Sequence, residues 1–303
     1  MAAFEALVKL SKLNPAANSS FRALQDYKEG MSAFELGDFE TALEKWQPLA
    51  DKGIPSAQTS LGAMYQDGKG VTKDYSRAKT WFRLAADQGN PGAQYNLGLI
   101  YHDGQGVQTD FTEAARWFRL AANQGTADAQ YNLGLMYFDG NGLPQDYAEA
   151  MKWYLLAAKQ GDASAQTNLG GMYKDSEGVP QDFTEAMKWC RLAADQGNAG
   201  AQYNLGLMYY NGNGTPQNYV QAMKWYLLAA KQGTASAQIN LGVMYYEGQG
   251  SPQDFVTAHM WAAIGNSNGH ANGGNLRDFI ANSMTAEEIS EAQRLARFYK
   301  KSG

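Results

Sequence analysis

The sequence predicts an all-α solenoid, that is, a stack of helix–turn–helix repeats. Three observations lead to this prediction. An Ala-Gln pair returns at residues 57, 93, 129, 165, 201 and 237, so each step is 36 residues. Each repeat carries two apolar stripes with helical spacing, and a glycine-rich segment separates them. Six copies in register are typical of a repeat array, in which neighbouring units bury each other's apolar faces.

The first half of each repeat is predicted to form a helix, named helix A here. Its apolar residues follow the spacing i, i+4, i+7 and i+8, which places them on one helix face. Gly104 is expected to end this helix in the left-handed conformation, and Gly106 to act as a second flexible joint. Gly98 interrupts helix A at a cost of roughly 1 kcal/mol, which suggests that two backbones approach closely there. In the second repeat the stripe consists of Ala93, Leu97, Ile100 and Tyr101.

The second half of each repeat is predicted to form another helix, named helix B. Asp110 is a suitable N-cap, because its carboxylate accepts from backbone N–H groups of the first turn. The stripe that follows consists of Phe111, Ala114, Ala115, Phe118, Ala121 and Ala122. All the tryptophans are assigned to one position of helix B and to the core shared by neighbouring repeats, rather than to a sugar- or cofactor-stacking ladder. They are Trp46, Trp81, Trp117, Trp153, Trp189, Trp225 and Trp261. Trp153→Ala is expected to cost about 3–5 kcal/mol on this basis.

The two ends of the chain are predicted to cap one continuous solenoid. Residues 1–56 form an N-terminal helix and a shorter, tetratricopeptide-like repeat, and residues 57–272 hold the six full repeats. Residues 273–303 form the C-terminal caps, since terminal repeats of a stack are atypical. At the N-terminus the expected elements are a short helix over 1–14, a loop over 16–20 and helices over 21–36 and 38–52.

At the C-terminus we expect a helix over 276–282 and then a last amphipathic helix. Thr285 and Glu288 have the spacing of a capping box, in which each side chain bonds to the other residue's backbone N–H. Two roles stay open for the last helix: it covers the final repeat, or it binds a partner or a second copy of the chain. The apolar stripe of this helix consists of Ile289, Ala292, Leu295, Ala296 and Tyr299.

The repeated unit reads A-Q-x-N-L-G-x-M-Y-x-x-G-x-G-x-x-x-D-(Y/F)-x-x-A-x-x-W-(F/Y)-x-x-A-A-x-Q-G. It closely resembles the Sel-one-like repeat (SLR), a subfamily of the tetratricopeptide-like helical repeats. The resemblance implies a right-handed α-solenoid and a non-enzymatic bacterial scaffold that binds other proteins. A cysteine-rich secreted branch of the family is associated with penicillin binding or weak β-lactamase activity. Cys190 is the single cysteine of this chain, so that activity is not transferred.

Composition and charge limit the kinds of partner and the cellular compartment that the sequence predicts. The net charge is −5 and no block of Lys and Arg occurs, which argues against nucleic acid, since phosphates require clustered cations. No run of about 18 apolar residues is present, so no membrane span is expected. Glu5, Lys9 and Lys12 interrupt the first 15 residues, which is unlike a signal peptide. We therefore expect a cytoplasmic monomer, or a periplasmic or secreted protein if a leader has been removed.

Comparison of the repeats with one another separates scaffold from surface. Three positions of helix A vary, and they are spaced i, i+4 and i+7, so they share one face distinct from the core stripe. In tetratricopeptide-like arrays the matching face lines the concave groove, and aromatic side chains with polar tips suit protein recognition there. Asparagine amides beside them can pair with a peptide backbone. The candidate partner-binding residues are Tyr95, Leu99, His102, Tyr131, Leu135, Phe138, Thr167, Lys174, Tyr203, Leu207, Tyr210 and Tyr246, with Asn96, Asn132, Asn168 and Asn204.

The alternative for these residues is structural: the tyrosines pack on a neighbouring helix A and the asparagines tie repeats together. The repeat over 165–200 differs from the others at Thr167, Lys174 and Cys190, which indicates either a notch in the groove or simple drift.

No catalytic residues, metal site or cofactor are predicted. The three histidines are scattered, and the Gly-rich loops lack the alternating carboxylates of a calcium site. The expected function is protein or peptide binding in the groove. The alternatives are a hydrolase-like or small-molecule-binding protein, and an exported factor that contacts host or cell-envelope components.

Overall fold

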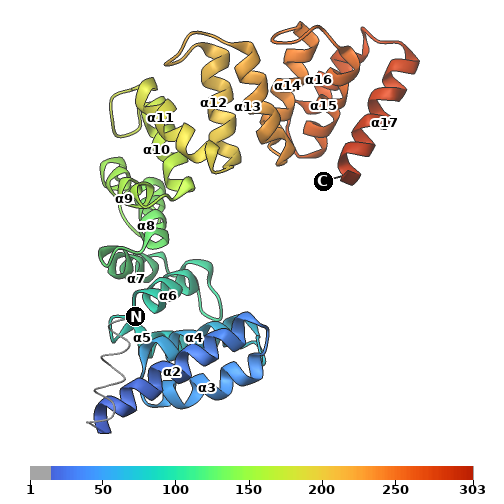
Figure 1. The fold of residues 1–303 in the computed structure, drawn as a ribbon. Coiled ribbons are helices and arrows are strands. Elements are labelled where there is room, and N and C mark those ends of the chain that lie inside the picture. Colours follow the sequence, from blue (N-terminus) through green and yellow to red (C-terminus); the bar gives the residue numbers. More distant parts are fainter. Residues whose placement is uncertain (1–14, 303) are drawn as a thin grey trace. The chain divides into compact units, whose positions relative to one another are not determined.

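The computed structural model describes residues 15–302, and over this range the chain folds into α-helices joined by loops (Figure 1). The chain divides into two compact units, Met1–Gln145 and Asp146–Gly303. Within each unit, consecutive helices pack against one another, so each repeat is a helical hairpin stacked on the next. The all-α solenoid predicted from the period is confirmed.

The first unit contains the N-terminal hairpin and the first two and a half repeats. Helices A are α4, α6 and α8, and helices B are α5 and α7. The bounds are α2 (Pro15–Glu35), α3 (Phe39–Asp51), α4 (Pro55–Asp67), α5 (Tyr75–Ala86), α6 (Pro91–Asp103), α7 (Phe111–Asn123) and α8 (Ala127–Asp139).

The second unit continues the same alternation and ends in two further helices. Helices B are α9, α11, α13 and α15, and helices A are α10, α12 and α14. The bounds are α9 (Tyr147–Lys159), α10 (Ala163–Asp175), α11 (Phe183–Asp195), α12 (Ala199–Asn211), α13 (Tyr219–Lys231), α14 (Ala235–Glu247), α15 (Phe255–Ser267), α16 (Gly273–Ala281) and α17 (Ala286–Ser302).

The N-terminal hairpin differs from the prediction in its first helix. A loop was expected over 16–20, but α2 already begins at Pro15. Proline suits the first turn of a helix, because its φ is preset and its missing N–H has no partner there in any case. The helix expected over 1–14 lies outside the described residues. α3 forms as predicted, with Asp38 accepting from the Thr41 N–H at 3.1 Å.

The ends of the repeat helices follow the predicted chemistry. Asp110 caps α7 by accepting from the Glu113 N–H at 3.0 Å, and Gly104 ends α6 with a φ of 70°. Gly106, the second joint of this loop, also takes the left-handed conformation. Its φ is 69°, and a Cβ there would lie 2.6 Å from Cβ of Tyr75, so this glycine lets the loop pack on helix B of the preceding repeat.

The fourth repeat lacks the glycine that ends helix A elsewhere. Ser176 takes the left-handed conformation in its place, with a φ of 66°. Among the described residues it is the one non-glycine residue with a positive φ. Its Oγ donates to the Val179 carbonyl at 3.2 Å. A residue with a Cβ is strained in this conformation, so α10 ends less favourably than its counterparts.

The core of each repeat is formed where helix B meets a glycine of helix A. Helix B places the Phe118 ring directly on Gly98, so a Cβ at Gly98 would collide with that ring. The prediction that two backbones approach there is therefore wrong for this repeat: the glycine makes room for a side chain. Backbones do approach at Gly242, where a Cβ would lie 3.2 Å from the carbonyl oxygen of Ala258. The buried stripe residues Ala93, Leu97, Ile100, Ala114, Ala115, Ala121 and Ala122 are confirmed as core, whereas Tyr101 is half-buried and Phe111 is exposed.

The tryptophans do not all occupy one position, which corrects the prediction. Trp46 lies 36 residues before Phe82, not before Trp81, and its ring packs on Gly30 as Phe82 packs on Gly62. Of the others, Trp117, Trp225 and Trp261 are buried in the inter-repeat core, whereas Trp81, Trp153 and Trp189 are half-buried. The cost of 3–5 kcal/mol that was expected for Trp153→Ala therefore applies to Trp117 instead.

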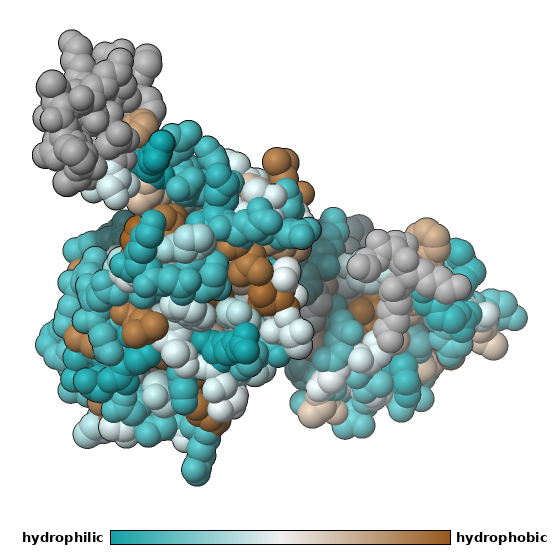
Figure 2. All heavy atoms as spheres, turned by 90° about the horizontal axis from the view of Figure 1, so that it is seen from below, coloured by the Kyte–Doolittle hydropathy of each residue, from teal (hydrophilic) through white to brown (hydrophobic). Residues whose placement is uncertain are grey.

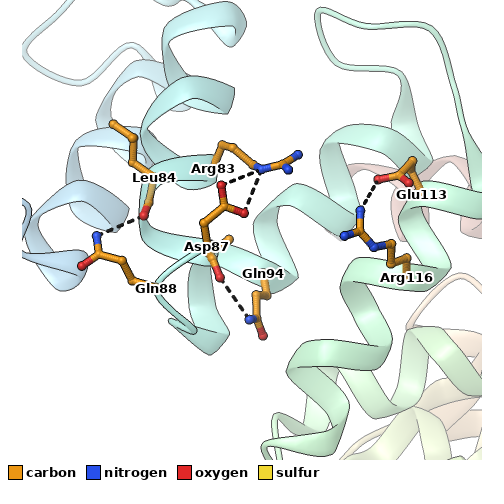
Figure 3. Close-up of polar contacts among 8 residues, drawn as sticks. Arg83, Leu84, Asp87, Gln88, Gln94, Glu113 and Arg116 are labelled. Carbon is orange, nitrogen blue, oxygen red and sulfur yellow. Dashed lines mark hydrogen bonds and ion pairs between the residues drawn. The ribbon is translucent and has the colours of Figure 1, made fainter.

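Buried glutamines join consecutive repeats, and this explains the Gln of the Ala-Gln pair. Gln94 at the start of α6 donates to the Ala86 carbonyl of α5 at 3.2 Å (Figure 3). Its Oε1 accepts from Gln124 Nε2 at 2.7 Å, so the side chain is satisfied on both sides. Gln58, Gln130, Gln166, Gln202 and Gln238 make the same bond to the carbonyl eight residues earlier. We name this set the glutamine ladder.

The C-terminal helices cover the last repeat. The predicted capping box is present: the Thr285 N–H donates to Glu288 at 2.8 Å, and the Glu288 N–H donates to Thr285 Oγ1 at 3.2 Å. Both α16 and α17 pack on α15, and the Tyr299 ring meets Trp261 with 5.1 Å between ring centroids. Of the two roles left open for the last helix, the covering role is the one that this packing supports.

Candidate functional site

The variable residues of helix A share one face, which we name the helix-A face. Within each unit this face runs along successive helices A. All sixteen residues predicted for it are half-buried, so each presents part of its surface to solvent. They are Tyr95, Asn96, Leu99, His102, Tyr131, Asn132, Leu135, Phe138, Thr167, Asn168, Lys174, Tyr203, Asn204, Leu207, Tyr210 and Tyr246.

The tyrosines of this face pack on helix B of their own repeat. The Tyr95 ring lies 5.8 Å from the Phe118 ring between centroids, and the Tyr203 ring lies 5.9 Å from that of Tyr226. The contact is therefore with the ring that covers the helix-A glycine. Tyr203 also packs against the buried cluster that includes Leu241 and Met244 of the next helix A, as the structural alternative expected. Because the tyrosines remain half-exposed, they form both the edge of the core and part of the surface.

A second row of ring pairs lies at the end of helix A. His102 meets Phe111 at 5.4 Å between ring centroids, and Tyr210 meets Tyr219 at 5.2 Å. Tyr246 contacts two rings, Phe255 at 5.4 Å and Phe279 of α16 at 5.3 Å. The C-terminal cap thus extends the aromatic row by one side chain. Helices α6, α8 and α12 thus contribute aromatic or apolar surface to the face at two levels, whereas α10 presents Thr167 and Lys174 there.

Two pockets open on this face, one in each unit. The pocket of the first unit has a volume of about 210 Å³ and lies between α2, α3 and α4. The pocket of the second unit has a volume of about 160 Å³ and lies between α12, α13 and α14. The first is lined by Tyr27, Met31, Phe34, Glu35, Trp46, Ser60 and Ala63, and the second by Leu207, Tyr210, Asn211, Tyr226, Asn240 and Val243.

The two pockets occupy the same place in the repeat. Phe34 precedes Tyr210 by 176 residues, as Met31 precedes Leu207 and Glu35 precedes Asn211. The remaining three positions of the second pocket are each matched 180 residues earlier, by Trp46, Ser60 and Ala63. The offset changes because the loop of the N-terminal hairpin is four residues shorter. Every lining residue of the second pocket thus has its counterpart in the first, so the two pockets occupy equivalent positions of two repeats.

The floors of the two pockets differ in their polar atoms. Trp46 Nε1 donates to the Tyr27 carbonyl at 3.1 Å, so the floor of the first pocket is satisfied. The Tyr226 hydroxyl is buried, and the Asn240 side chain of the next repeat lies beside it as a hydrogen-bond partner. Burial raises the pKa of Tyr226, and Asn240 lies close enough to act in the opposite direction. The polar atoms at the floors of both pockets are therefore buried and engaged within the protein.

The asparagines of helix A have different neighbours in different repeats. Asn132 Nδ2 donates to the Asp128 carbonyl of its own helix at 2.8 Å. Asn204 and Asn240 instead lie beside the floor residue of the preceding repeat, Cys190 and Tyr226 respectively. For these two, the structure agrees with the expectation that asparagines connect repeats.

In the fourth repeat, the floor position of helix B holds Cys190. Of the six full repeats, the last has a smaller residue there, Ala262. Cys190 fills the place of the aromatic ring against Gly170, and burial raises the pKa of its thiol to about 12. Thr167 Oγ1 donates to the Ala163 carbonyl at 2.7 Å, and Lys174 pairs with Asp175 at 2.7 Å. The side chains of this repeat are therefore engaged locally, and the thiol is not poised to react.

Sequence reasoning missed Tyr27, Met31 and Phe34, which continue the helix-A face in α2. They have the spacing i, i+4 and i+7, and Gly30 lies among them as Gly98 lies among Tyr95, Leu99 and His102. Aligning Gly30 with Gly62 reveals the correspondence. The floor residues Trp46 and Tyr226 were also missed, because they come from helix B and were treated as core alone.

Away from the helix-A face, a hollow of about 860 Å³ in the first unit is lined by α2, by the end of α3 and by Ile54 and Ser56. Figure 2 shows one face of the molecule, on which hydrophobic residues form small separate patches between hydrophilic ones. Within residues 15–302, no group of three His, Cys, Asp or Glu side chains is arranged to hold a metal ion. In the same part of the chain, no helix is long and apolar enough to cross a membrane.

The stacked hairpins and their shared face define the class of protein, an α-solenoid of the tetratricopeptide-like kind. The model of the Sel1 repeat family matches residues 55–90, 91–126, 127–162, 163–198, 199–234 and 235–270. The chain belongs to the Sel1 repeat family, whose members generally mediate protein–protein interactions. No catalytic family is indicated.

Solved structures agree with this assignment. A Sel1 repeat protein from Oxalobacter formigenes is 35% identical, with a TM-score of 0.71, over 80% of this chain and 99% of the other. The protective antigen c5321 of uropathogenic Escherichia coli, which displays an SLR fold, is 24% identical with a TM-score of 0.50. That alignment covers 98% of this chain and 94% of the antigen and shows the fold alone. The comparison with curated proteins gave no match.

Proposed function

We propose that this protein is a non-enzymatic scaffold that binds an extended segment of a partner protein along the helix-A face. One observation carries the proposal: the same pocket is formed in equivalent register in both units, with different side chains on the same positions. A fixed pocket with variable lining lets each unit recognise a different side chain of a partner. Half-buried aromatic side chains around it suit protein binding, because they are rigid and amphipathic.

The test fills the pockets without altering the scaffold. Leucine occupies the positions of Ala63 and Val243 in other repeats, as Leu99, Leu135 and Leu207, so the chain already accommodates it there. Ala63→Leu and Val243→Leu together are therefore expected to leave folding intact while removing space from both pockets. Linear peptides selected from a displayed random library against the full chain serve as the probe.

We expect the pocket-filled variant to bind the selected peptides about tenfold more weakly, since lost side-chain burial of this size costs roughly 1.4 kcal/mol. Leu120→Gln on the exposed side of α7 is the matched control and should leave the affinity unchanged. Equal affinity of wild type and pocket-filled variant would place the binding site elsewhere on the molecule. A library that yields no binder would count against peptide recognition altogether.

A further inference from the structure

We propose that the outer side of the helices B in the second unit is a further binding surface, which takes an acidic amphipathic helix of a partner protein. The surface centres on one leucine from each of three successive helices B. We name these residues the leucine row: Leu156 of α9, Leu192 of α11 and Leu228 of α13. Three observations point to this occupant: the exposure of the row, the helix that covers the equivalent residue of α15, and the charges beside the row. The proposal does not depend on binding at the helix-A face.

The leucine row is exposed although its residues are apolar. Leu228 is 37% exposed, and Leu156 and Leu192 are more exposed still. Each leucine follows the floor residue of its repeat by two positions, which places it about 200° around helix B from that residue and away from the helix-A face. Single exposed leucines are common on protein surfaces, but here the same residue returns in register on successive helices.

The leucine is retained while its exposed neighbours change. The residue before it is leucine or arginine, and the residue three positions after it is basic, acidic or neutral. In chain order from the first repeat, these later residues are Asp87, Asn123, Lys159, Asp195 and Lys231. Divergence of the repeats has thus changed the charge beside the leucine but not the leucine itself. The exposed part of this side chain adds nothing to the core, so contact with a partner is the better explanation for its retention.

The last repeat shows what covers this position. Its counterpart of the leucine is Ile264, which is only 1% exposed. Ile264 belongs to the buried cluster on which Ala296 and Tyr299 of α17 pack, and the Tyr299 ring lies against Trp261. In α15 the outer side of a helix B is therefore already a docking surface for an amphipathic helix. The leucine row continues that surface onto α13, α11 and α9.

The charges beside the leucine row favour an acidic helix. The positions four residues before and three residues after each leucine lie on the same helix face as the leucine. They hold Lys152, Lys159, Lys188, Asp195, Lys224 and Lys231. Among the described residues, Lys159, Lys224 and Lys231 form no ion pair, and the other two lysines pair with a glutamate of their own helix. In α15, where α17 covers this face, the same positions hold the uncharged Met260 and Ser267. Carboxylates beside the apolar stripe of a docked helix would complement the exposed lysines.

The first unit provides an internal comparison. Leu84 and Leu120 occupy the same position in α5 and α7 and are similarly exposed. Their flanking residues are Thr80, Asp87, Arg116 and Asn123. The apolar residue is thus shared by both units, whereas the lysines are confined to the second. The preference for an acidic helix is proposed for the second unit alone.

The experiment uses two fluorescein-labelled peptides, titrated with the full chain and followed by fluorescence anisotropy. The native peptide has the sequence of α17. The acidic peptide is the same sequence with glutamate in place of its basic residues, Arg294, Arg297, Lys300 and Lys301. The acidic peptide should bind about tenfold more tightly than the native one, and added salt should reduce the difference, because it screens exposed charges.

Two variants test the leucines and the lysines separately. Leu192→Gln/Leu228→Gln should weaken binding of the acidic peptide about tenfold, because less apolar surface is buried in the complex. Lys224→Glu/Lys231→Glu changes exposed side chains only and should reverse the order of the two peptides.

Leu120→Gln is the matched control, because it changes the same residue at the same repeat position, outside the lysine-flanked row. It should leave the affinity for the acidic peptide unchanged. The inference is overturned if the acidic peptide does not bind, or if it binds Leu192→Gln/Leu228→Gln as tightly as wild type. Equal affinity for the two peptides also overturns it, because α17 of a second copy would then fit as well as an acidic helix.

Vesicles of phosphatidylserine and phosphatidylcholine in equal parts test a membrane surface as the occupant. We expect no difference in vesicle binding between wild type and Leu192→Gln/Leu228→Gln. If vesicle binding depends on these leucines while peptide binding does not, the surface binds anionic lipid and the acidic-helix assignment is wrong.

These outcomes are separate from the test of the helix-A face. Ala63→Leu/Val243→Leu fills the pockets of that face and should leave the affinity for the acidic peptide unchanged. If the acidic peptide instead depends on open pockets, it binds at the helix-A face, and the further surface on the helices B is refuted while the scaffold proposal stands.

Discussion

The glutamine ladder gives the most direct test of how consecutive repeats are held together. Gln94 is 4% exposed and makes two hydrogen bonds, to the Ala86 carbonyl at 3.2 Å and from Gln124 Nε2 at 2.7 Å. Gln94→Ala removes both. The first bond joins α5 of one repeat to α6 of the next, so its loss weakens the interface between these two repeats.

The expected loss of stability depends on the hydrogen bonds that the Ala86 carbonyl and the Gln124 side chain retain in the variant. The Ala86 carbonyl still accepts from the Gly89 N–H at 2.9 Å, and Gln124 Nε2 still donates to the Gly89 carbonyl at 3.0 Å. Neither partner is left unpaired, so the cost is that of two ordinary bonds, about 1–3 kcal/mol in all. Gln94→Glu is nearly the same shape but faces the Ala86 carbonyl with an acceptor. At neutral pH it should therefore cost more than Gln94→Ala.

Urea denaturation of wild type, both single variants and Gln94→Ala/Gln124→Ala measures these costs and the coupling between the two glutamines. The double variant should cost about 0.5–1 kcal/mol less than the sum of the two single variants, because their shared bond is counted twice in the sum. Native-state hydrogen exchange should show the loss concentrated in α5 and α6. A change below about 0.5 kcal/mol for Gln94→Ala, or equal stability of Gln94→Ala and Gln94→Glu, would refute the structural role of the ladder.

Three further predictions concern single positions. Ser176→Gly should raise the free energy of unfolding by about 0.5–1 kcal/mol in urea, because it relieves the left-handed strain at the end of α10; an unchanged or lower stability would contradict this. Trp117→Ala should cost about 3–5 kcal/mol and Trp189→Ala about half as much, since Trp189 is only half-buried; equal losses would show that burial does not set the difference. Burial, and then the charge of Arg277, lower the pKa of His259, so the folded state favours the neutral imidazole. The free energy of unfolding should therefore decrease as the pH falls below about 6.5, the pKa of histidine in the unfolded chain. His259→Met, which introduces the residue of Met151, Met187 and Met223, should remove this dependence in thermal unfolding at several pH values; an unaltered slope would assign it to another group.

The parts of the fold that depend on local sequence were predictable, and those that depend on how helices meet were not. The apolar stripes, the Asp110 cap and the Thr285 capping box are local patterns, and each is found as expected. The residue opposite Gly98 is not local, so a backbone contact was inferred where the Phe118 ring lies. Trp46 was misassigned because residue type was followed instead of the period: it lies 35 residues before Trp81 and 36 before Phe82.

The candidate site was predictable to a similar extent. Variation between repeats identified the helix-A face, since it compares positions within one chain. It did not identify the pockets, because each combines two helices A with a floor residue from the helix B between them. Leu207 and Tyr210 were therefore expected on the face, whereas the contribution of Tyr226 became visible only when the three helices were placed together.

The contact between one helix-B side chain and a helix-A glycine has a consequence for how such arrays diversify. Phenylalanine, tyrosine, cysteine and alanine all occur at this position along the chain, as in Phe82, Tyr226, Cys190 and Ala262, each within an otherwise similar hairpin. A change of this one side chain alters the surface between two hairpins, whereas the caps and the glutamine ladder are formed by other residues. New binding preferences can therefore arise one repeat at a time, by duplication of a hairpin followed by exchange of one side chain.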